Sequence, residues 1–431
     1  MAKHHPFTFG RLKRDAATLL VGQVVYRGSG IIVLGVVARL LPAADLGAFF
    51  FAEAIAAMLL VVSGFGMNPL LMRRAAAQPD RAGDPLAALL GYRLLAAPVY
   101  LAAACGVAYL AGGVSSWLAL TLAAAAMLED LSFSFGALFF ARKRIGWNVA
   151  IGVVVQVVFV AMLLVGLRWR PSLETWAVVT LLRSLMLAGA YGVVAGAAFV
   201  PIRVRWDGPF VMAGLPFILI SVLTIARDRA DTFLLGLLAA PASVAGYQLA
   251  WRVIAATLFV PITVGTTLYP DLAASGADPH NRRRFGRALV GLTVVGLLGT
   301  LLLILLASPL CRLLYGPQAP AVVPLLKAAA VLVPMLFVEG LIATSLQAMH
   351  RERAVVRFML IGLAAGVATN VALVPTIGAI GAVVSQLIAS AVRLSMAVVA
   401  LRGTGLFRGA VGAITSPTCA PAVEGIEHAA V

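Results

Sequence analysis

Twelve long apolar runs dominate this 431-residue sequence, and each is about as long as a helix that crosses the hydrocarbon core of a bilayer. A soluble chain has no interior that could hide so much apolar surface, since 62% of the residues are hydrophobic and only 12% are charged. Runs this long and rich in Ala and Leu favour helices over strands, because a helix satisfies its own backbone in lipid. We therefore predict an all-α polytopic membrane protein of about 12 transmembrane helices. The expected spans are residues 16–38, 46–67, 86–110, 115–140, 147–167, 174–200, 209–238, 243–269, 288–308, 322–348, 353–374 and 378–401.

The basic residues alternate between the predicted loops and indicate an orientation. The net charge is +16, and 21 of the 33 Lys and Arg residues fall in loops on the side that holds both termini, against five on the opposite side. Cytoplasmic loops carry such an excess, so both termini are expected in the cytoplasm. This explanation of the charge leaves no need for nucleic acid as a partner. The first apolar run is too long for a cleavable signal peptide, which predicts a retained first span.

Catalytic and metal chemistry find little support in the sequence. Cys105, Cys311 and Cys419 lie far apart, and the five His residues form no cluster with metal-ligand spacing. The loops are short and contain no phosphate-binding P-loop. We expect no enzymatic activity, no cofactor and no metal. Because the chain has no P-loop for ATP, any transport would be driven by a gradient, by substrate flux or by a partner.

A sequence repeat divides the chain near its middle. Pro42 is followed five residues later by Gly47, and Pro241 is followed in the same way by Gly246. A duplicated six-helix unit would enter the membrane twice in the same orientation, with the copies related by an axis along the membrane normal. We predict two six-helix bundles, residues 1–207 and 208–408, around a central cavity, and a disordered cytoplasmic tail over residues 409–431. Chance similarity in a low-complexity sequence is the alternative.

Short motifs along nearly the whole chain resemble those of known transporters. They are Ala38-Arg39-Leu40-Leu41-Pro42 with Asp45-Leu46-Gly47, Asp231–Gly236 with Val244–Ala250, Tyr269–Ala273, Leu314–Gly316 and Asn370–Ala382. Together and in this order, they are similar to the polysaccharide, or O-antigen-type, flippases of the multidrug/oligosaccharidyl-lipid/polysaccharide superfamily.

The resemblance implies an alternating-access carrier of the bacterial inner membrane. It would move undecaprenyl-pyrophosphate-linked oligosaccharide from the cytoplasmic to the outer leaflet for O-antigen, capsule or exopolysaccharide assembly. Its partners would be this lipid-linked oligosaccharide, the lipid bilayer, a polysaccharide polymerase and glycosyltransferases. The resemblance also implies that helices one, two, seven and eight line the cavity. The Gly and Pro motifs are scaffold: Pro42 and Pro241 begin helices, while Gly47 and Gly246 allow close helix approach.

Arginines inside the predicted spans are candidate contacts for a diphosphate, because the planar fork of arginine donors suits phosphate and is costly in lipid. Arg27 lies midway along the first span with Gln23 one turn before it, and Arg252 lies in the eighth span with Gln248 one turn before it. We predict that both arginines face the cavity. A structural ion pair, for example with Glu53, is the alternative.

The seventh span carries Arg227, Asp228, Arg229 and Asp231 within five residues. Four charges so close together cannot all face one side of a helix, so this segment is expected to border water. It would act as a gate, a substrate contact or a broken helix, with pairing of Arg227 and Asp231 along the helix as the alternative. Asp231 is also a candidate for proton or ion coupling.

The remaining charges inside the spans have open roles. Glu53, Glu129 and Asp130 are candidates for proton or ion coupling, with salt bridges between helices as the alternative. Arg93 is expected to extend its side chain to the cytoplasmic interface, and Arg393 could reach the same interface.

Three other functions compete with the flippase. A cation-coupled multidrug exporter on the same scaffold would favour acid-dominated pockets, which the deep arginines oppose. A peptidoglycan-precursor flippase resembles this scaffold but usually carries fourteen helices. A membrane glycosyltransferase or polymerase usually has large external loops, and the external loops predicted here are short.

Overall fold

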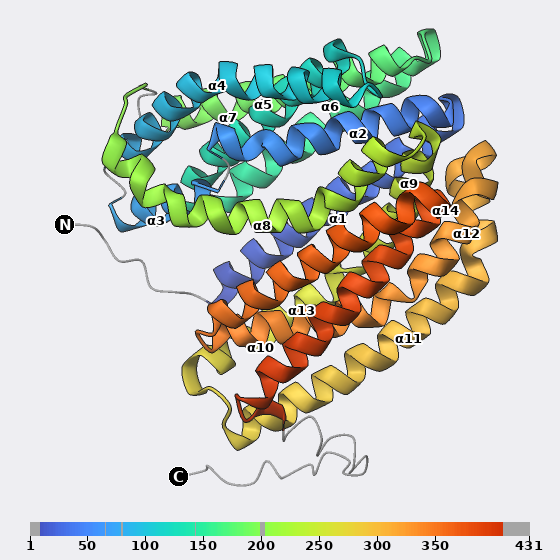
Figure 1. Ribbon diagram of the computed structural model, residues 1–431. Helices are drawn as coiled ribbons and strands as arrows, with labels where there is room; N and C mark the ends of the chain where they lie inside the picture. Colours follow the sequence, from blue (N-terminus) through green and yellow to red (C-terminus); the bar gives the residue numbers. More distant parts are fainter. Residues whose placement is uncertain (1–8, 65, 79–80, 143, 199–202, 408–431) are drawn as a thin grey trace. The chain divides into compact units, whose positions relative to one another are not determined.

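The computed structural model describes residues 9–64, 66–78, 81–142, 144–198 and 203–407, and these ranges contain helices and turns but no strand (Figure 1). The prediction of an all-α membrane protein is confirmed. The α-helices are α1 (Phe9–Leu40), α2 (Ala43–Leu59), α3 (Asn68–Ala77), α4 (Gly83–Ala111), α5 (Ser116–Ala141), α6 (Ile145–Trp169), α7 (Leu173–Ala198), α8 (Gly208–Leu238), α9 (Pro241–Thr257), α10 (Phe259–Ser275), α11 (Pro279–Tyr315), α12 (Ala319–Ala330), α13 (Leu332–Ala348) and α14 (Glu352–Arg402). Two short 3₁₀ turns, η1 (Leu60–Ser63) and η3 (Gly316–Gln318), follow α2 and α11.

Eight helical segments of the described chain are long and apolar enough to cross a membrane, by length and composition. Two of them are long enough for two crossings each: α11 with α12 extends over 52 residues and α14 over 51 residues. Helix α14 contains Gly378 with φ 58° and ψ −134°, a backbone conformation that favours glycine, at the boundary between two predicted spans. A count of about 12 transmembrane helices fits these lengths.

Two predicted spans are interrupted where proline removes a helical hydrogen bond. The span predicted over 243–269 breaks at Leu258, between α9 and α10, and the span over 322–348 breaks at Val331, between α12 and α13. Pro261 and Pro334 lie four residues after the last residues of α9 and α12. Because proline has no N–H to donate to the residue four before it, each helix ends at that residue.

Side-chain caps fix the starts of two long helices. The backbone N–H of Leu118 donates to the Ser115 hydroxyl at 3.3 Å, and the N–H of Phe210 donates to an Asp207 carboxylate oxygen at 3.1 Å. Such caps satisfy backbone donors that have no partner in the first turn of a helix. They determine where α5 and α8 begin.

The contacts divide the chain into two compact units. Unit 1 comprises residues Met1–Val253, Leu306–Ala328 and Leu363–Gln386. Within it, α2 packs beside α5 and α8, and α5 also packs against α4 and α7 (Figure 1). The interior of this unit is mostly apolar and includes the fully buried side chains of Phe50, Ile55 and Tyr100.

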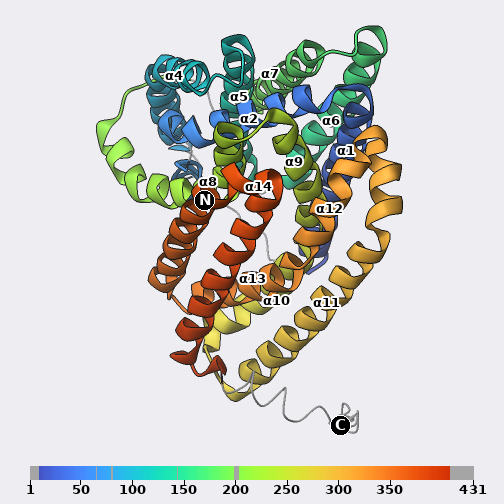
Figure 2. The ribbon, with the colours of Figure 1, turned by 45° about the vertical axis from the view of Figure 1, so that its right-hand side comes forward.

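Unit 2 comprises residues Ile254–Leu305, Ala329–Gly362 and Leu387–Val431. Helices α10 and α13 lie side by side in it (Figure 2). Gly296 of α11 touches the backbone of Pro334 in α13, so that a side chain at position 296 would not fit. The division of the sequence into halves at residues 1–207 and 208–408 stays a prediction.

The two proline–glycine motifs of the repeat meet inside unit 1. A Cβ atom on Gly47 would overlap the carbonyl oxygen of Pro241, and a Cβ on Gly246 would lie 3.0 Å from the Leu325 side chain. The predicted close approach of helices at Gly47 is confirmed. Nearby, the guanidinium of Arg39 donates to the carbonyl of Leu313.

Candidate functional site

Three charged residues from three helices of unit 1 lie at the same depth along their helices. Glu53 is ten residues after the start of α2, Arg252 is eleven residues after the start of α9, and Arg229 is nine residues before the end of α8. At 1.5 Å per residue, each lies about 15 Å from the turn where its helix begins or ends. This distance is about half the thickness of the hydrocarbon core of a bilayer.

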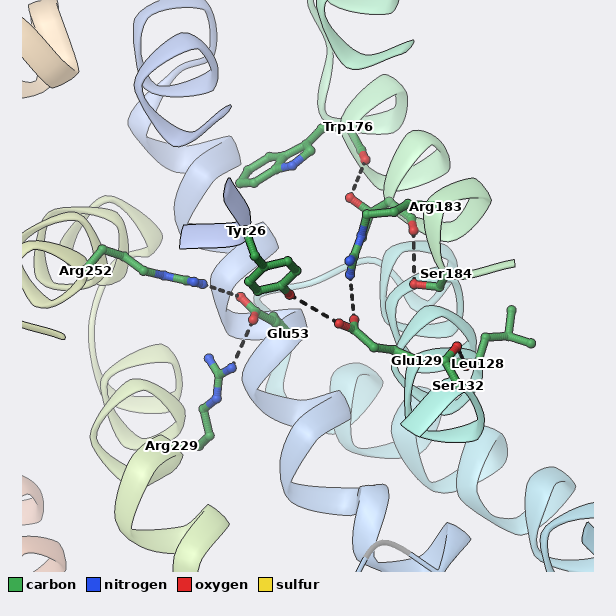
Figure 3. A network of polar contacts seen from close by, with 11 residues as sticks. Tyr26, Glu53, Leu128, Glu129, Ser132, Trp176, Arg183, Ser184, Arg229 and Arg252 are labelled. Carbon is green, nitrogen blue, oxygen red and sulfur yellow. Dashed lines mark hydrogen bonds and ion pairs between the residues drawn. The ribbon is translucent and has the colours of Figure 1, made fainter. Parts of the chain in front are cut away.

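Glu53 holds both arginines (Figure 3). The Nη2 of Arg229 donates to Oε1 of Glu53 at 3.0 Å, and the Nη2 of Arg252 donates to Oε2 at 3.2 Å. The side chains are partly exposed, at 30% for Glu53, 28% for Arg229 and 43% for Arg252. Two cations against one anion leave an excess of positive charge on a partly open surface, which can hold an anion.

A second network adjoins the first. The Nη2 of Arg183 donates to Oε2 of Glu129 at 2.6 Å, and the Tyr26 hydroxyl donates to Oε1 at 3.5 Å. Figure 3 shows the ring of Tyr26 between Glu53 and Glu129. Arg183 is 11% exposed and its guanidinium carbon lies 5.4 Å from the centre of the Phe159 ring, so this arginine is enclosed by its partners.

Aromatic side chains pack beside the Glu53 network. The ring of Phe49 stacks on Trp176 of α7 with 3.5 Å between centroids, and Phe50 meets the same indole edge-on at 5.8 Å. The guanidinium carbon of Arg252 lies 5.8 Å from the centre of the Phe50 ring. A cation over an aromatic face is attracted to it, so the buried Phe50 ring helps to position Arg252.

Asp231 lies in a separate buried cluster formed by α8, α9 and α14. The Tyr247 hydroxyl donates to its Oδ2 at 2.9 Å, and the Asn370 amide donates to its Oδ1 at 2.8 Å. The Oδ1 of Asn370 is itself buried without a hydrogen-bond partner. Beside this cluster, Gln248 is 3% exposed and its amide donates to the Thr232 hydroxyl. The structure therefore does not bring Gln248 to the surface on which Arg252 is exposed.

The other charges form ion pairs. Arg227 pairs with its neighbour Asp228 at 2.8 Å, and both side chains are partly exposed, as expected for a segment that borders water. Asp130 pairs with Arg93 and also accepts the amide of Asn68 at 2.9 Å. Asp130 thus forms the salt bridge between helices that was the alternative to a coupling role. The role of Asp130 in coupling stays a prediction.

Two sequence-based expectations about arginines are wrong. Arg93 does not reach the interface, because its side chain is 6% exposed and bound to Asp130 of the neighbouring helix α5. Arg393 is also buried, at 3%, and its Nε donates to Glu339 of α13 at 2.8 Å. In both cases a carboxylate on another helix compensates the charge of the buried guanidinium.

Gln23 and Arg27 belong to helix α1, but their side chains lie outside the described part of the structure, so their contacts with a ligand stay predictions. Sequence reasoning missed Asn370 and Tyr26. Asn370 stands in a motif that resembles a scaffold turn, and a tyrosine in an apolar span carries no signal of its own. No group of three or more metal-ligating side chains occurs among the described residues.

Comparison with known proteins gives the fold and the family. The lipid II flippase MurJ in an inward closed conformation has a TM-score of 0.74 with this chain at 12% identity, covering 93% of this chain and 90% of the other. A multidrug resistance MATE family transporter of the MOP superfamily, in an inward-facing conformation, has a TM-score of 0.62 at 15% identity, covering 93% and 98%. At these identities the likeness concerns the fold alone.

Sequence comparison adds a relative and two family profiles. The protein described as "Probable flippase AglR" of Haloferax volcanii is 28% identical over 178 residues, which are 40% of this chain and 37% of the archaeal protein. The matched stretch is therefore well under half of that relative. The MatE profile matches residues 216–372, and the profile described as "Polysaccharide biosynthesis protein" matches residues 12–275. Because this second match covers more than half of the sequence, the chain belongs to the polysaccharide biosynthesis protein family.

Proposed function

We propose that this protein is an alternating-access flippase for undecaprenyl-pyrophosphate-linked oligosaccharide. It moves repeat units from the cytoplasmic to the outer leaflet of the bacterial inner membrane for O-antigen, capsule or exopolysaccharide assembly. Family membership, the fold and the partial match to an archaeal flippase support this class of activity. A polysaccharide polymerase and glycosyltransferases are its proposed partners.

The observation that carries the proposal is the pair of arginines that share Glu53, each about 15 Å along its helix from the nearest turn. A diphosphate on a lipid needs cationic donors in a polar site, and arginine presents a fork of donors that matches phosphate oxygens. Arg252 and Arg229 approach one carboxylate from two helices and are partly exposed. A charged side chain exposed that far along a spanning helix would be costly against lipid, so these arginines face a polar path.

The proposal also names the residues that couple transport to an ion or proton, and the side of the membrane on which the termini lie. Asp231, with Asn370 and Tyr247, is the proposed coupling group for an ion or proton, because it is a buried carboxylate that links α8 to α9 and α14. Glu129 and Asp130 are weaker candidates, since each already binds an arginine. The excess of basic residues in one set of loops supports cytoplasmic termini.

The test is deletion of the gene followed by measurement of which leaflet holds the lipid-linked oligosaccharide. We expect accumulation on the cytoplasmic face and loss of surface polymer, both restored by the wild-type gene. Complementation with Arg252→Ala is expected to fail at normal expression and membrane insertion. An unchanged leaflet distribution and intact polymer, in a strain without a redundant gene, would reject the flippase.

The second candidate is a cation-coupled multidrug exporter, favoured by the match of the MatE profile and by the shared fold. Cells that express the protein would then export ethidium faster than cells with an empty vector. A flippase for an anionic lipid gives no such increase, because two arginines surround the single carboxylate of Glu53 and their excess positive charge disfavours a cationic drug such as ethidium.

A further inference from the structure

We infer that Glu53 is an internal counter-anion which holds Arg229 and Arg252 while the carrier is empty and which the diphosphate of the substrate displaces. The inference rests on the proposed function and adds a regulatory step to the same site. It assigns to Glu53 the role of a built-in competitor for the substrate, which differs from the proton or ion coupling for which its position in the sequence makes it a candidate.

The geometry of the carboxylate supports this role. Glu53 offers one oxygen to each arginine, at 3.0 and 3.2 Å, and so bridges α8 and α9 from α2. A diphosphate presents oxygens of the same kind, which guanidinium groups bind in the same planar manner. The carboxylate therefore occupies the donors that a diphosphate would use.

The other described ion pairs differ from this one. Arg93 and Arg393 are buried at 6% and 3% exposure and each is held by one acid, and Arg183 is enclosed at 11%. Among the described ion pairs, Glu53 is the carboxylate that two arginines share, and Arg252 has the most exposed side chain of these arginines, at 43%. A ligand can reach Arg252 without dismantling a packed helix interface.

Exchange of anions at these arginines solves a problem of the transport cycle. After release of the substrate the empty carrier has to return to its first conformation, and two bare guanidinium groups inside the carrier would oppose any closure that removes water. Glu53 neutralises one of the two charges and gives both arginines a hydrogen-bond acceptor. When substrate binds, its diphosphate takes over both donors and Glu53 moves away, so neither arginine is ever left without an acceptor.

The test measures by calorimetry how tightly inorganic pyrophosphate binds to the purified full-length protein, and compares the wild type with variants at Glu53. Glu53→Gln removes the competing charge and keeps the side-chain shape, so we expect pyrophosphate to bind about tenfold tighter or better than to wild type. Glu53→Asp keeps the charge on a shorter side chain that reaches one arginine, so its affinity should lie between the two. In reconstituted vesicles, Glu53→Gln should lower both the half-saturating substrate concentration and the maximal rate.

The matched control is Asp271→Asn, which removes a carboxylate from Arg284 at an exposed pair in unit 2. It makes the same change in net charge and should leave pyrophosphate affinity unchanged. Unchanged or weaker binding by Glu53→Gln, with binding by wild type and its loss in Arg252→Ala, would overturn the inference and leave the proposed function intact. If neither the wild type nor any variant binds pyrophosphate, and Arg252→Ala complements the deletion fully, both the inference and the proposed function are rejected. If Glu53→Gln does not fold, affinity of Glu53→Asp at or below that of wild type overturns the inference.

Discussion

The buried pair of Arg93 and Asp130 gives the prediction with the best-defined magnitude. The two side chains are 6% and 2% exposed, and Asp130 also accepts a hydrogen bond from Asn68 at 2.9 Å. The substitution Asp130→Ala leaves the Arg93 guanidinium buried with its charge uncompensated, which costs about 3–5 kcal/mol. Loss of the Asn68 hydrogen bond adds about 1 kcal/mol. We therefore expect destabilisation by about 4–6 kcal/mol.

The measurement is the free energy of unfolding of the purified protein in mixed micelles of a mild detergent and sodium dodecyl sulfate. The matched control is Asp271→Ala, whose partner Arg284 is exposed, and its cost should stay below about 1 kcal/mol. The double variant Arg93→Met with Asp130→Leu removes both charges and keeps apolar volume, so it should regain most of the lost stability.

The result that would refute this reasoning is a cost for Asp130→Ala as small as that of Asp271→Ala. It would mean that Arg93 finds water or another acceptor once Asp130 is gone. Failure of the double variant to regain stability would point instead to a requirement for the polar network that includes Asn68 and the Ser134 hydroxyl, which donates to the Asn68 amide oxygen.

Three further predictions concern single positions. Gly47→Val should destabilise the protein by about 1–3 kcal/mol in the same unfolding assay, because the new side chain meets the Pro241 carbonyl. The control Gly28→Val, next to open space, should destabilise it less. Equal losses of stability would contradict the close contact at Gly47. Gly378→Ala should cost about 1–3 kcal/mol because alanine is strained at φ 58° and ψ −134°, whereas Gly189→Ala, in an open helical position, should be neutral or stabilising. Arg252→Lys should reduce flux in the complementation assay nearly as much as Arg252→Ala, since lysine lacks the planar fork; wild-type flux would show that a point charge suffices.

The sequence predicts the membrane-spanning helices well because lipid imposes a length and an apolar composition that can be counted. The start of α8 at Gly208 and its end at Leu238 lie within one residue of the predicted range 209–238. The interruptions at Leu258 and Val331 are less visible, since apolar composition continues across them. Their signal is local: Pro261 and Pro334 each remove one backbone donor.

The candidate site is predicted in part. Position in a span singles out Arg252 and Glu53 as charges that need a partner, and a pair between Glu53 and an arginine is among the alternatives that the sequence leaves open. The link between Arg229 and Glu53 joins residues 176 positions apart, and no spacing rule connects them. The same limit explains the error at Arg93, because the acid that holds it lies on the next helix and only the packing of α4 on α5 brings the two together.

The contacts around Gly47 and Arg39 have a consequence for how this chain can vary. Their acceptors and touching atoms are main-chain carbonyls, of Pro241 and of Leu313. Every residue type supplies the same carbonyl, so side-chain changes on that side leave these contacts in place. A one-residue insertion in the first turn of α9, directly after Pro241, would instead rotate Pro241 by about 100° relative to the rest of the helix and carry its carbonyl away from Gly47. These contacts therefore depend on the register of the helices more than on the identity of the residues that supply the carbonyls.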